Sequence, residues 1–338
     1  MHNAINSNMS ETAVSGTAGR TCPLHYRYAT SGFDRLPRTE LANLDVLYVV
    51  GGLYGNTLAL GAIESLFAAE TGIKRMVFNG DFHWFDANGA AFSQIQAGVG
   101  RHLAIRGNVE TELVSDHSDA GCGCAYPDWV EDGVVQRSNE ILQLLRRYVT
   151  SNARSHLSAL PMWEVASVGA KQIGIVHGDA ESLAGWGFAQ EHLRDASHRA
   201  QAARWFEQAQ VDVFASTHTC LPVMQQISTP NKNHWIINNG AAGMPNIQAD
   251  LAGLITRIAV TPYAGPHSRA HVQFDDLHID LLAVDIDQAL WQSAFISMWP
   301  QDSHAHASYW NRIAQGPDYE LDQVIRPSQD ETNAVKGV

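Results

Sequence analysis

At 338 residues the chain is long enough to bury a sizeable core, and 45% of its residues are hydrophobic, as in ordinary globular proteins. Its 22 Lys and Arg against 35 Asp and Glu give a formal net charge of −13. Because this charge repels nucleic-acid phosphates, we expect no nonspecific nucleic-acid binding. No apolar run approaches the roughly 20 residues of a membrane span, and the first residues lack a signal-peptide core. The cysteines show no disulfide framework, so we expect a cytoplasmic protein without membrane contact.

The N-terminal part of the chain predicts a polar leader followed by the first strand and helix. Residues 1–25 are rich in Asn, Ser, Thr, Gly and Ala, a composition typical of disorder. Residues 44–50 form a nearly continuous apolar run that ends in Gly51 and Gly52. Residues 56–69 then carry apolar side chains at helical spacing, so we expect a strand, a tight turn and a helix.

Two further short apolar runs end in a glycine beside a polar residue. Residues 76–78 lead to Gly80 and Asp81, and residues 102–105 lead to Gly107 and Asn108. Sites in α/β proteins are commonly built from such strand ends. We therefore expect both polar side chains to lie at one edge of a sheet.

The middle of the chain predicts an insertion and then a hairpin. Within an insertion over 109–160, residues 109–148 begin as an irregular acidic loop rich in Cys and Gly and close with a helix over 134–148. Residues 163–168 and 172–176 alternate as the strands of a β-hairpin, and the second strand runs directly into His177.

The second half of the chain is expected to be more antiparallel than the first. Residues 189–210 have helical spacing and precede an apolar strand over 211–215, which is followed by His218. Three later segments are predicted to be antiparallel strands, namely 254–260, 272–274 and 279–284. These elements predict one main domain over 26–285, while 286–338 is expected to hold two amphipathic helices and a polar tail.

The polar residues at the strand ends are a candidate metal-ligand set. They offer one carboxylate, one amide oxygen and two imidazoles, from Asp81, Asn108, His177 and His218. A mixed oxygen and nitrogen set favours Mn, Fe or Zn over Mg or Ca. Such an ion would polarise a phosphoryl oxygen and activate water, which predicts phosphoester hydrolysis. The alternative reading is that Asp81 and Asn108 only cap helices or turns.

The order of these motifs resembles the calcineurin-like metallophosphoesterases, in particular their small bacterial phosphodiesterase branch. The similar stretches span roughly residues 44–262 and are Gly52–Asn56, Gly80-Asp81, Gly107–Glu110, His177-Gly178, Thr217–Pro222 and Asn239–Pro245. The resemblance implies an α/β fold, a four-layer αββα sandwich of two mixed sheets flanked by helices. It also implies that Asp81, Asn108, His177 and His218 hold one metal ion.

The chain departs from the family pattern at the other metal site. Gly52, Tyr54 and Cys220 stand where the family has an Asp and two His ligands to the first ion. Val109 stands where many members place a catalytic His. The resemblance therefore implies one divalent ion rather than the usual pair.

Several other residues are candidates for substrate contact or catalysis. His83 and Asp179 each lie two residues beyond an inferred ligand, where they could orient water or protonate a leaving oxygen. Tyr54, Asn56 and Cys220 could contact the substrate. Several of these roles have a structural alternative. His83 could be a packed side chain, and Asn56 could begin its helix. Asp179 and Glu110 could accept hydrogen bonds from backbone N–H groups in loops.

The cysteines leave two readings open. A zinc site could use Cys22, Cys122, Cys124 and Cys220, but their spacing lacks paired Cys-x-x-Cys knuckles. Small buried or reactive thiols are the other reading.

The leading hypothesis is a metal-dependent hydrolase of a small phosphomonoester or phosphodiester that uses a single Mn, Fe or Zn ion. The rival hypothesis is a catalytically silent relative that keeps the sandwich as a binding or assembly surface. The sequence does not specify the substrate, the metal, the general acid or the oligomeric state.

Overall fold

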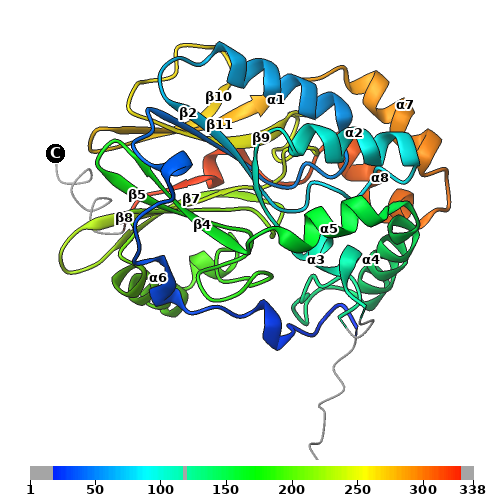
Figure 1. The fold of residues 1–338 in the computed structure, drawn as a ribbon, viewed down its shortest axis with the longest axis horizontal. Helices are drawn as coiled ribbons and strands as arrows, with labels where there is room; N and C mark the ends of the chain where they lie inside the picture. Colours follow the sequence, from blue (N-terminus) through cyan, green and yellow to red (C-terminus); the bar gives the residue numbers. More distant parts are fainter. Residues whose placement is uncertain (1–17, 117–119, 329–338) are drawn as a thin grey trace, which may run out of the picture.

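The computed structural model describes residues 18–116 and 120–328. These residues form two six-stranded sheets that pack face to face (Figure 1). The first sheet has the order β10 (Ser268–Phe274), β11 (Leu277–Val284), β9 (Gly253–Ala259), β1 (Val46–Val50), β2 (Lys74–Asn79) and β3 (Leu103–Ile105). The second has the order β12 (Ile325–Arg326), β7 (Pro222–Ser228), β8 (Asn233–Asn239), β6 (Val213–Ser216), β5 (Lys171–Val176) and β4 (Trp163–Val168).

Each sheet is mixed, with a parallel group of strands beside antiparallel ones. In the first sheet β1, β2 and β3 are parallel, and β9 pairs antiparallel with both β1 and β11. In the second sheet β5, β6 and β8 are parallel, and β4 and β7 pair antiparallel at either side. The parallel strands of each group end on the same side, which brings the loops after β2, β3, β5 and β6 together.

The space between the sheets is filled by apolar side chains that alternate along the strands. In β1, Leu47 and Val49 belong to the core between the sheets, whereas Val46, Tyr48 and Val50 face the helices on the other side. This period of two is what a strand buried on both faces requires. All five residues of β1 are buried, so the apolar run in the sequence reflects burial on both faces.

Helices cover the two outer faces and one end of the sandwich (Figure 1). On the side of the first sheet lie α1 (Thr57–Ala69), α2 (Gly89–Val99) and α7 (Gln288–Met298), and α6 (Ala196–Ala209) covers the second sheet. At one end lie α3 (Asn108–Val114), α4 (Asp132–Leu145), α5 (Ser151–Ala159) and α8 (His304–Gln315). The expected four-layer αββα sandwich is confirmed.

Short 3-10 helices complete the described elements. They are η1 (Leu24–Tyr26), η2 (Thr30–Phe33), η3 (Thr39–Leu41), η4 (Arg146–Tyr148), η5 (His192–Arg194) and η6 (Leu321–Gln323).

The N-terminal boundary differs from the sequence expectation. Residues 1–17 of the expected leader lie outside the described residues, but the leader does not extend to residue 25. The Arg20 guanidinium donates to the carbonyl of Val130 at 2.6 Å and pairs with Asp132. Tyr26 is fully buried. Sequence composition missed this attachment because its contacts are with the distant loop before α4.

The insertion over 109–160 is also more helical than expected. Asn108 already begins α3, and α5 precedes the hairpin. Two strands were not predicted from sequence, β7 and the short β12. In both cases neighbouring strands supply the stabilising contacts. The sequence of β7 and β12 has no alternation of polar and apolar residues from which a strand could be predicted.

The residues after 285 share the main core rather than forming an appendage. Trp291, Phe295 and Trp299 pack in the cluster outside the first sheet, and Tyr319 and Val324 lie between the sheets. The division at residue 285 therefore does not separate two independently packed parts. The polar tail expected after Pro327 falls outside the described residues from 329 onward.

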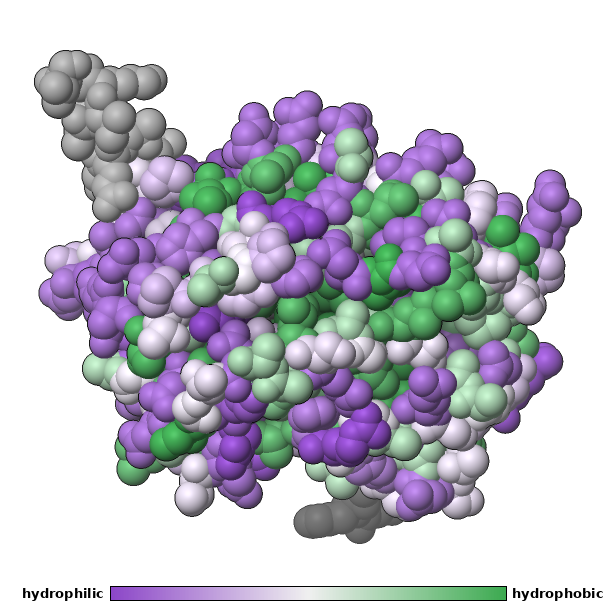
Figure 2. All heavy atoms as spheres, turned by 90° about the horizontal axis from the view of Figure 1, so that it is seen from above, coloured by the Kyte–Doolittle hydropathy of each residue, from purple (hydrophilic) through white to green (hydrophobic). Residues whose placement is uncertain are grey.

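The outer side of α7 keeps some apolar surface. The face seen from above, which α1 and α7 cover, carries hydrophobic side chains interspersed with hydrophilic ones (Figure 2). On α7, Leu290 is 54% exposed and Ile296 41% exposed. None of the helices in the described ranges has the length and apolarity to span a bilayer.

Candidate metal centre

Asp81 is held in a left-handed backbone conformation directly after β2. Its φ is 53°, a conformation that side chains other than Gly rarely adopt and that surrounding contacts must stabilise. The buried carboxylate of Glu110 accepts N–H groups of Asp81 at 2.8 Å, of Phe82 at 3.0 Å and of Gly107 at 2.9 Å. Glu110 thus joins the turn after β2 to the start of α3. It accepts backbone N–H groups, which is the alternative that the sequence offered for this residue.

Asn108 begins α3, and its amide is oriented by the loop that follows. The Nδ2 group donates to the carbonyl of Cys122 at 2.9 Å. Oδ1 therefore turns the other way and lies 3.0 Å from His177 Nε2. The two glycines before Asp81 and Asn108 permit this approach, because a Cβ on Gly107 would lie 2.3 Å from Asp81 Oδ1.

His177 and His218 follow β5 and β6 and face each other. His177 Nδ1 lies 2.9 Å from the carbonyl oxygen of Asn79, and His218 Nε2 lies 3.2 Å from that of Cys124. Carbonyl oxygens only accept, so each of these ring nitrogens carries the hydrogen. The opposite nitrogens, His177 Nε2 and His218 Nδ1, are 3.1 Å apart.

Lone pairs from these residues therefore point into one small volume. His177 Nε2 lies 3.1 Å from His218 Nδ1, 3.0 Å from Asn108 Oδ1 and 3.4 Å from Asp81 Oδ1. Possible ligand atoms of Asp81, His177 and His218 all lie within 4.8 Å of one another, and these residues are buried. Buried acceptors that face each other repel unless a proton or a cation lies between them.

The charges in the cluster are strongly linked. Burial opposes ionisation of Asp81, but His177 and His218 outweigh it and lower the pKa of that carboxyl. Burial alone would lower the pKa of His177, yet the Asp81 carboxylate outweighs it and raises that pKa. Burial and the nearby His177 lower the pKa of His218 to about 3. His218 is therefore a neutral imidazole at physiological pH, as a metal ligand must be.

The donor set fits a divalent ion of borderline softness. Two imidazole nitrogens, a carboxylate and an amide oxygen are ligands that Mn, Fe and Zn accept. Each imidazole donates its other N–H to a backbone carbonyl, the arrangement that usually orients metal-binding histidines. Within the described part of the chain, no other set of three or more His, Cys, Asp or Glu side chains converges in this way.

Tyr54 and Cys220 lie together where the sequence pattern lacks ligands for another ion. The Tyr54 hydroxyl is 2.8 Å from Cys220 Sγ. Burial raises the pKa of Tyr54 well above its usual value and also raises the pKa of the Cys220 thiol. Burial therefore favours the neutral form of both groups.

His83 contacts other side chains of the protein rather than the ligand cluster. Its Nδ1 lies 2.5 Å from Asp86 Oδ2, its Nε2 lies 3.2 Å from Gln96, and its ring stacks on Phe92 at 4.0 Å. The side chain is completely buried. The expected catalytic role does not fit this packed position, because no face of the ring is left for substrate or water.

Asp179 is likewise a structural residue. Its carboxylate accepts the N–H groups of Glu181, Ser182 and Gly187, each at 3.0 Å. Burial raises its pKa, and these N–H groups oppose that rise. The geometry corrects the catalytic expectation for Asp179 and supports the alternative of a loop carboxylate.

Asn56 caps α1 instead of facing a substrate. Its Oδ1 accepts N–H groups of Leu58 at 3.1 Å and Ala59 at 3.0 Å, while Nδ2 donates to the carbonyl of Gly243 at 3.1 Å. All its polar atoms are occupied inside the protein, so the expectation of substrate contact does not fit.

The loop over 122–124 contributes its carbonyl groups to the centre. Cys122 orients Asn108, and the Cys124 carbonyl accepts N–H groups from His218 and Trp186. Among the described residues the cysteines form no zinc cluster of their own, and all four are free thiols.

A cavity of about 250 Å³ opens beside the cluster. Asp81, Asn108 and His218 line it, whereas His177 is buried and does not. The remaining lining residues are Tyr54, Trp84, Val109, Cys124, Tyr126, Val130, Val134, Trp186, Thr219, Cys220, Ser308, Tyr309 and Arg312.

Sequence reasoning missed most of these wall residues. Ser308, Tyr309 and Arg312 lie on α8, outside the stretch that resembles a known family, and Trp186 lies in the loop after β5. The amphipathic spacing of the last helices predicted that α8 packs on the body. It could not indicate that α8 packs beside the cluster.

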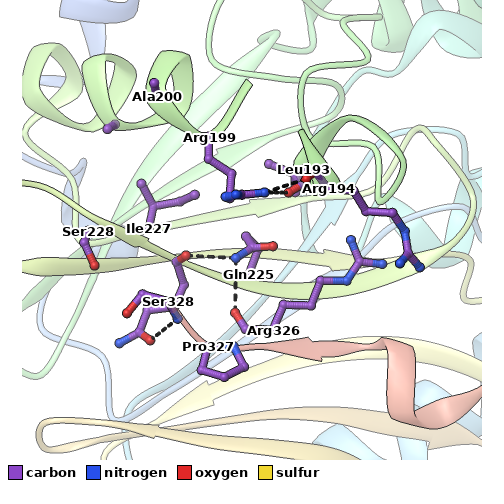
Figure 3. A pocket seen from close by; sticks show the side chains of 12 residues that line it. Leu193, Arg194, Arg199, Ala200, Gln225, Ile227, Ser228, Arg326, Pro327 and Ser328 are labelled. Carbon is purple, nitrogen blue, oxygen red and sulfur yellow. Dashed lines mark hydrogen bonds between the residues drawn. The ribbon is translucent and has the colours of Figure 1, made fainter. Parts of the chain in front are cut away.

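A larger hollow of about 550 Å³ lies elsewhere, along β7, β12 and the start of α6 (Figure 3). Arg194, Arg199 and Arg326 surround it, and Arg199 Nη1 donates to the carbonyl of Arg194 at 2.7 Å. This hollow shares no residue with the cavity at the cluster, and its described lining contains no His, Cys, Asp or Glu. It therefore offers no ligand set for a metal ion.

Comparison with known proteins supports the fold. No model of a protein family matches the sequence, and no curated protein matches it significantly. The solved structure of a metallophosphoesterase from Sphaerobacter thermophilus is similar, with a TM-score of 0.51 and 15% identity over 80% of this chain and 100% of that chain. A hypothetical protein from Pyrococcus horikoshii gives a TM-score of 0.54 and 14% identity over 81% of this chain and 99% of that chain. Together with the two mixed sheets and their helical layers, these structures show that the chain has the calcineurin-like metallophosphoesterase fold.

Proposed function

We propose that the protein is a metal-dependent phosphoester hydrolase that uses one divalent ion held by Asp81, Asn108, His177 and His218. The observation that carries this proposal is the convergence of lone pairs around His177 Nε2, with the three nearest acceptors at 3.0–3.4 Å. The metallophosphoesterase fold supports the same reaction class, since one similar structure belongs to a metallophosphoesterase.

A bound divalent ion would polarise a phosphoryl oxygen and lower the pKa of a water molecule toward neutrality. The protein would contribute a fixed and dry environment. Asp81 Oδ1 accepts the N–H of Val109 at 3.1 Å, and both histidines are oriented by backbone carbonyls. Because these partners are backbone groups, the site needs little reorganisation when charge develops.

One ion fits better than two. The position beside the cluster holds the Tyr54 hydroxyl and the Cys220 thiol, where the family pattern has two His ligands of the second ion. The substrate would be a small phosphorylated molecule, because the cavity of about 250 Å³ is below the usual size for drug-sized ligands. A cytoplasmic location remains part of this proposal.

Metal binding gives the first test. Chain purified without added metal should bind one Zn or Mn ion in calorimetric titration, and His177→Ala or His218→Ala should abolish binding. His267→Ala is the matched control, because His267 pairs with Asp285 at the surface away from the cluster. Binding of two ions, or unchanged binding in the cluster variants, would contradict the single-ion site.

Turnover gives the second test. The metal-loaded chain should hydrolyse aryl phosphates, with Mn, Fe and Zn compared at equal occupancy. Asp81→Asn and His218→Ala should reduce kcat/KM to background, while His267→Ala should retain it. A rate that survives in both cluster variants would come from another protein.

A catalytically silent binding protein is the second candidate. The pairing of Tyr54 with Cys220 at 2.8 Å favours it, because these residues replace ligands of a second ion. Without that ion the site lacks the two-ion clamp that stabilises both the attacking and the leaving oxygen. Stoichiometric metal binding without turnover of any phosphomonoester or phosphodiester would favour this candidate over the hydrolase.

A further inference from the structure

One wall of the cavity beside the cluster is formed by aromatic side chains. Trp186 and Tyr126 both line it, and their ring centroids lie 6.2 Å apart. The Trp186 ring also contacts His218, with centroids 5.5 Å apart at 75°. The aromatic wall is therefore continuous with the candidate metal centre.

The polar atoms of these two aromatic residues are occupied by the protein. Trp186 Nε1 donates to the carbonyl of Cys124 at 3.0 Å, and the Tyr126 hydroxyl lies 3.0 Å from Ser138 Oγ. Both rings are thereby fixed in place, and they turn carbon toward the cavity. Val130 and Val134 add aliphatic surface. Against this wall a flat apolar ring would gain contact, whereas a polyol or sugar would lose water for few hydrogen bonds.

Arg312 places a positive charge on the same cavity. Its Nε donates to the carbonyl of Pro245 at 2.8 Å, and Nη2 donates to that of Cys220 at 2.5 Å. These partners are neutral, and no described carboxylate lies within ion-pair distance of it. A guanidinium held in this way can bind a phosphoryl group through two parallel hydrogen bonds.

In the cavity, the titratable side chains outside the cluster that could protonate a leaving group are Tyr and Cys. Beyond the cluster residues Asp81 and His218, its described lining contains no His, Asp or Glu. An alkoxide is a poor leaving group without a proton donor, whereas a phenol, with a pKa of about 10 in Tyr, leaves more readily as its anion. An aryl leaving group therefore depends less on a proton donor than an alkyl one, and it matches the aromatic wall of Trp186 and Tyr126.

We propose that the cavity takes a small aryl phosphoester, with the phosphoryl group between the cluster and Arg312 and the aromatic ring against Trp186 and Tyr126. This rests on the proposed function and names its substrate class. In the reaction, water oxygen forms a bond to phosphorus and the bond from phosphorus to the aryl oxygen breaks. The products are phosphate and a phenol, whose oxygen keeps the bonding electron pair and takes up the proton released by water.

Equilibrium binding tests the ligand class without turnover. The full chain, metal-free and Zn-loaded, is titrated calorimetrically with phenylphosphonate and methylphosphonate, which are not hydrolysed. Phenylphosphonate should bind about tenfold more tightly, since ring contacts of this kind contribute about 1 kcal/mol or more. Trp186→Ala should remove the preference, and Trp186→Phe should largely keep it. Equal affinity for both ligands in the unsubstituted chain would overturn the proposal.

Arg312 has a separate signature. Arg312→Gln should weaken both phosphonates by about tenfold or more, as expected for a lost charge-assisted contact, and should leave the ratio between them unchanged. Arg204→Gln is the matched control, because Arg204 is bonded to Gln201 on exposed α6. Unchanged affinity in Arg312→Gln would remove Arg312 from the site.

Kinetics separates this inference from the proposed function. For the metal-loaded enzyme, kcat/KM should fall as the leaving phenol becomes more basic, and alkyl phosphates should react at least about 100-fold more slowly than phenyl phosphate, because an alkoxide leaves less readily than a phenolate. Hydrolysis of alkyl phosphates at the same rate would refute the aryl class and leave the hydrolase intact. Failure to bind metal, with the phenyl preference retained, would refute the hydrolase and support the ligand class.

Discussion

Gly107 shows how much of the candidate centre depends on one missing side chain. Its φ is −94°, which any residue can adopt, so the requirement for glycine here is steric. A Cβ at this position would lie 2.3 Å from Asp81 Oδ1 and 2.8 Å from His177 Cε1. Asp81 and His177 therefore pack against the backbone of Gly107, which directly precedes a third candidate ligand, Asn108.

Gly107→Ala should displace Asp81 and His177 and weaken Zn binding by about tenfold or more, because ligand orientation of this kind strongly affects metal affinity. Calorimetric titration measures the loss. The matched control is Gly61→Ala, at an exposed position of α1 where a Cβ would meet no atom within 4 Å. That variant should bind Zn normally and gain about 0.5–1 kcal/mol of unfolding free energy from helix propensity. Normal Zn affinity in Gly107→Ala would contradict the steric account.

His234 is a buried histidine outside the centre whose protonation should affect stability. It is 2% exposed, its ring stacks on Phe206 with centroids 4.4 Å apart, and Nδ1 lies 3.0 Å from the carbonyl of Val211. Burial, assisted by the charge of Lys232, lowers its pKa to about 4. The folded state thus resists protonation that the unfolded chain accepts near pH 6.5.

The contribution of His234 to stability is complete above pH 6.5 and is lost as the pH falls toward 4. Between pH 7 and pH 5 this one group should lower the unfolding free energy by about 1–2 kcal/mol. In His234→Gln the corresponding decrease should be smaller by that amount. Urea unfolding of both proteins at the two pH values measures the difference, and equal pH dependence would show that His234 titrates normally in the folded state.

At the scale of elements, α1 and α2 begin with the same residue type in different surroundings. Asn56 caps α1 and also donates to the buried carbonyl of Gly243, whereas Asn88 only accepts the N–H of Ala91 at 2.8 Å to cap α2. The first contact joins α1 to the loop after β8, across the rim where the two sheets meet. One side chain therefore serves both a helix end and the packing of two layers.

Asn88→Ala should lower the unfolding free energy by about 1 kcal/mol, the usual value of a helix cap. Asn56→Ala should cost about 1–3 kcal/mol more, because a buried carbonyl also loses its donor. Urea denaturation of the two variants tests the comparison directly. Equal losses would mean that the link to Gly243 contributes nothing measurable.

Helix α8 is an element that joins the fold to the cavity. Ser308 accepts a hydrogen bond from Arg137 Nε on α4 at 2.7 Å, while Tyr309 and Arg312 on the same helix line the cavity. The two helices thus form a wall whose position depends on their mutual contact. Selectivity of the cavity is consequently a property of the pair rather than of either helix alone.

At the scale of the whole molecule, the segment after residue 285 is part of the main core. Trp291 and Trp299 are each 2% exposed, and Tyr319 is 3% exposed between the sheets. A chain that ends at residue 285 should therefore lose cooperative unfolding in urea and its near-ultraviolet circular dichroism, because large buried side chains leave both cores. A chain that ends at Ser328 keeps every described contact and should unfold like the full chain. A sharp transition in the shorter chain would show that the fold does not need the residues after 285.

The sequence was informative where structure is local. Strands such as β1 could be predicted because burial on both faces produces an uninterrupted apolar run, and Asp81 and His177 could be located because each follows such a run. The sequence was less informative about side-chain direction. His83 turns toward Asp86 and Gln96, and Asp179 turns toward backbone N–H groups, because nearby partners satisfy them. Arg312 could not be predicted as a wall residue, since its place depends on how α8 packs against residues far away in sequence.

The candidate metal ligands lie between residues 81 and 218, whereas the wall that carries Arg312 lies on α8 at residues 304–315. Synthesis proceeds from the N-terminus, so every ion-binding side chain leaves the ribosome before the guanidinium does. Since residues after 285 complete both cores, the ion-binding side chains can be held in their final positions only once the last helix has docked.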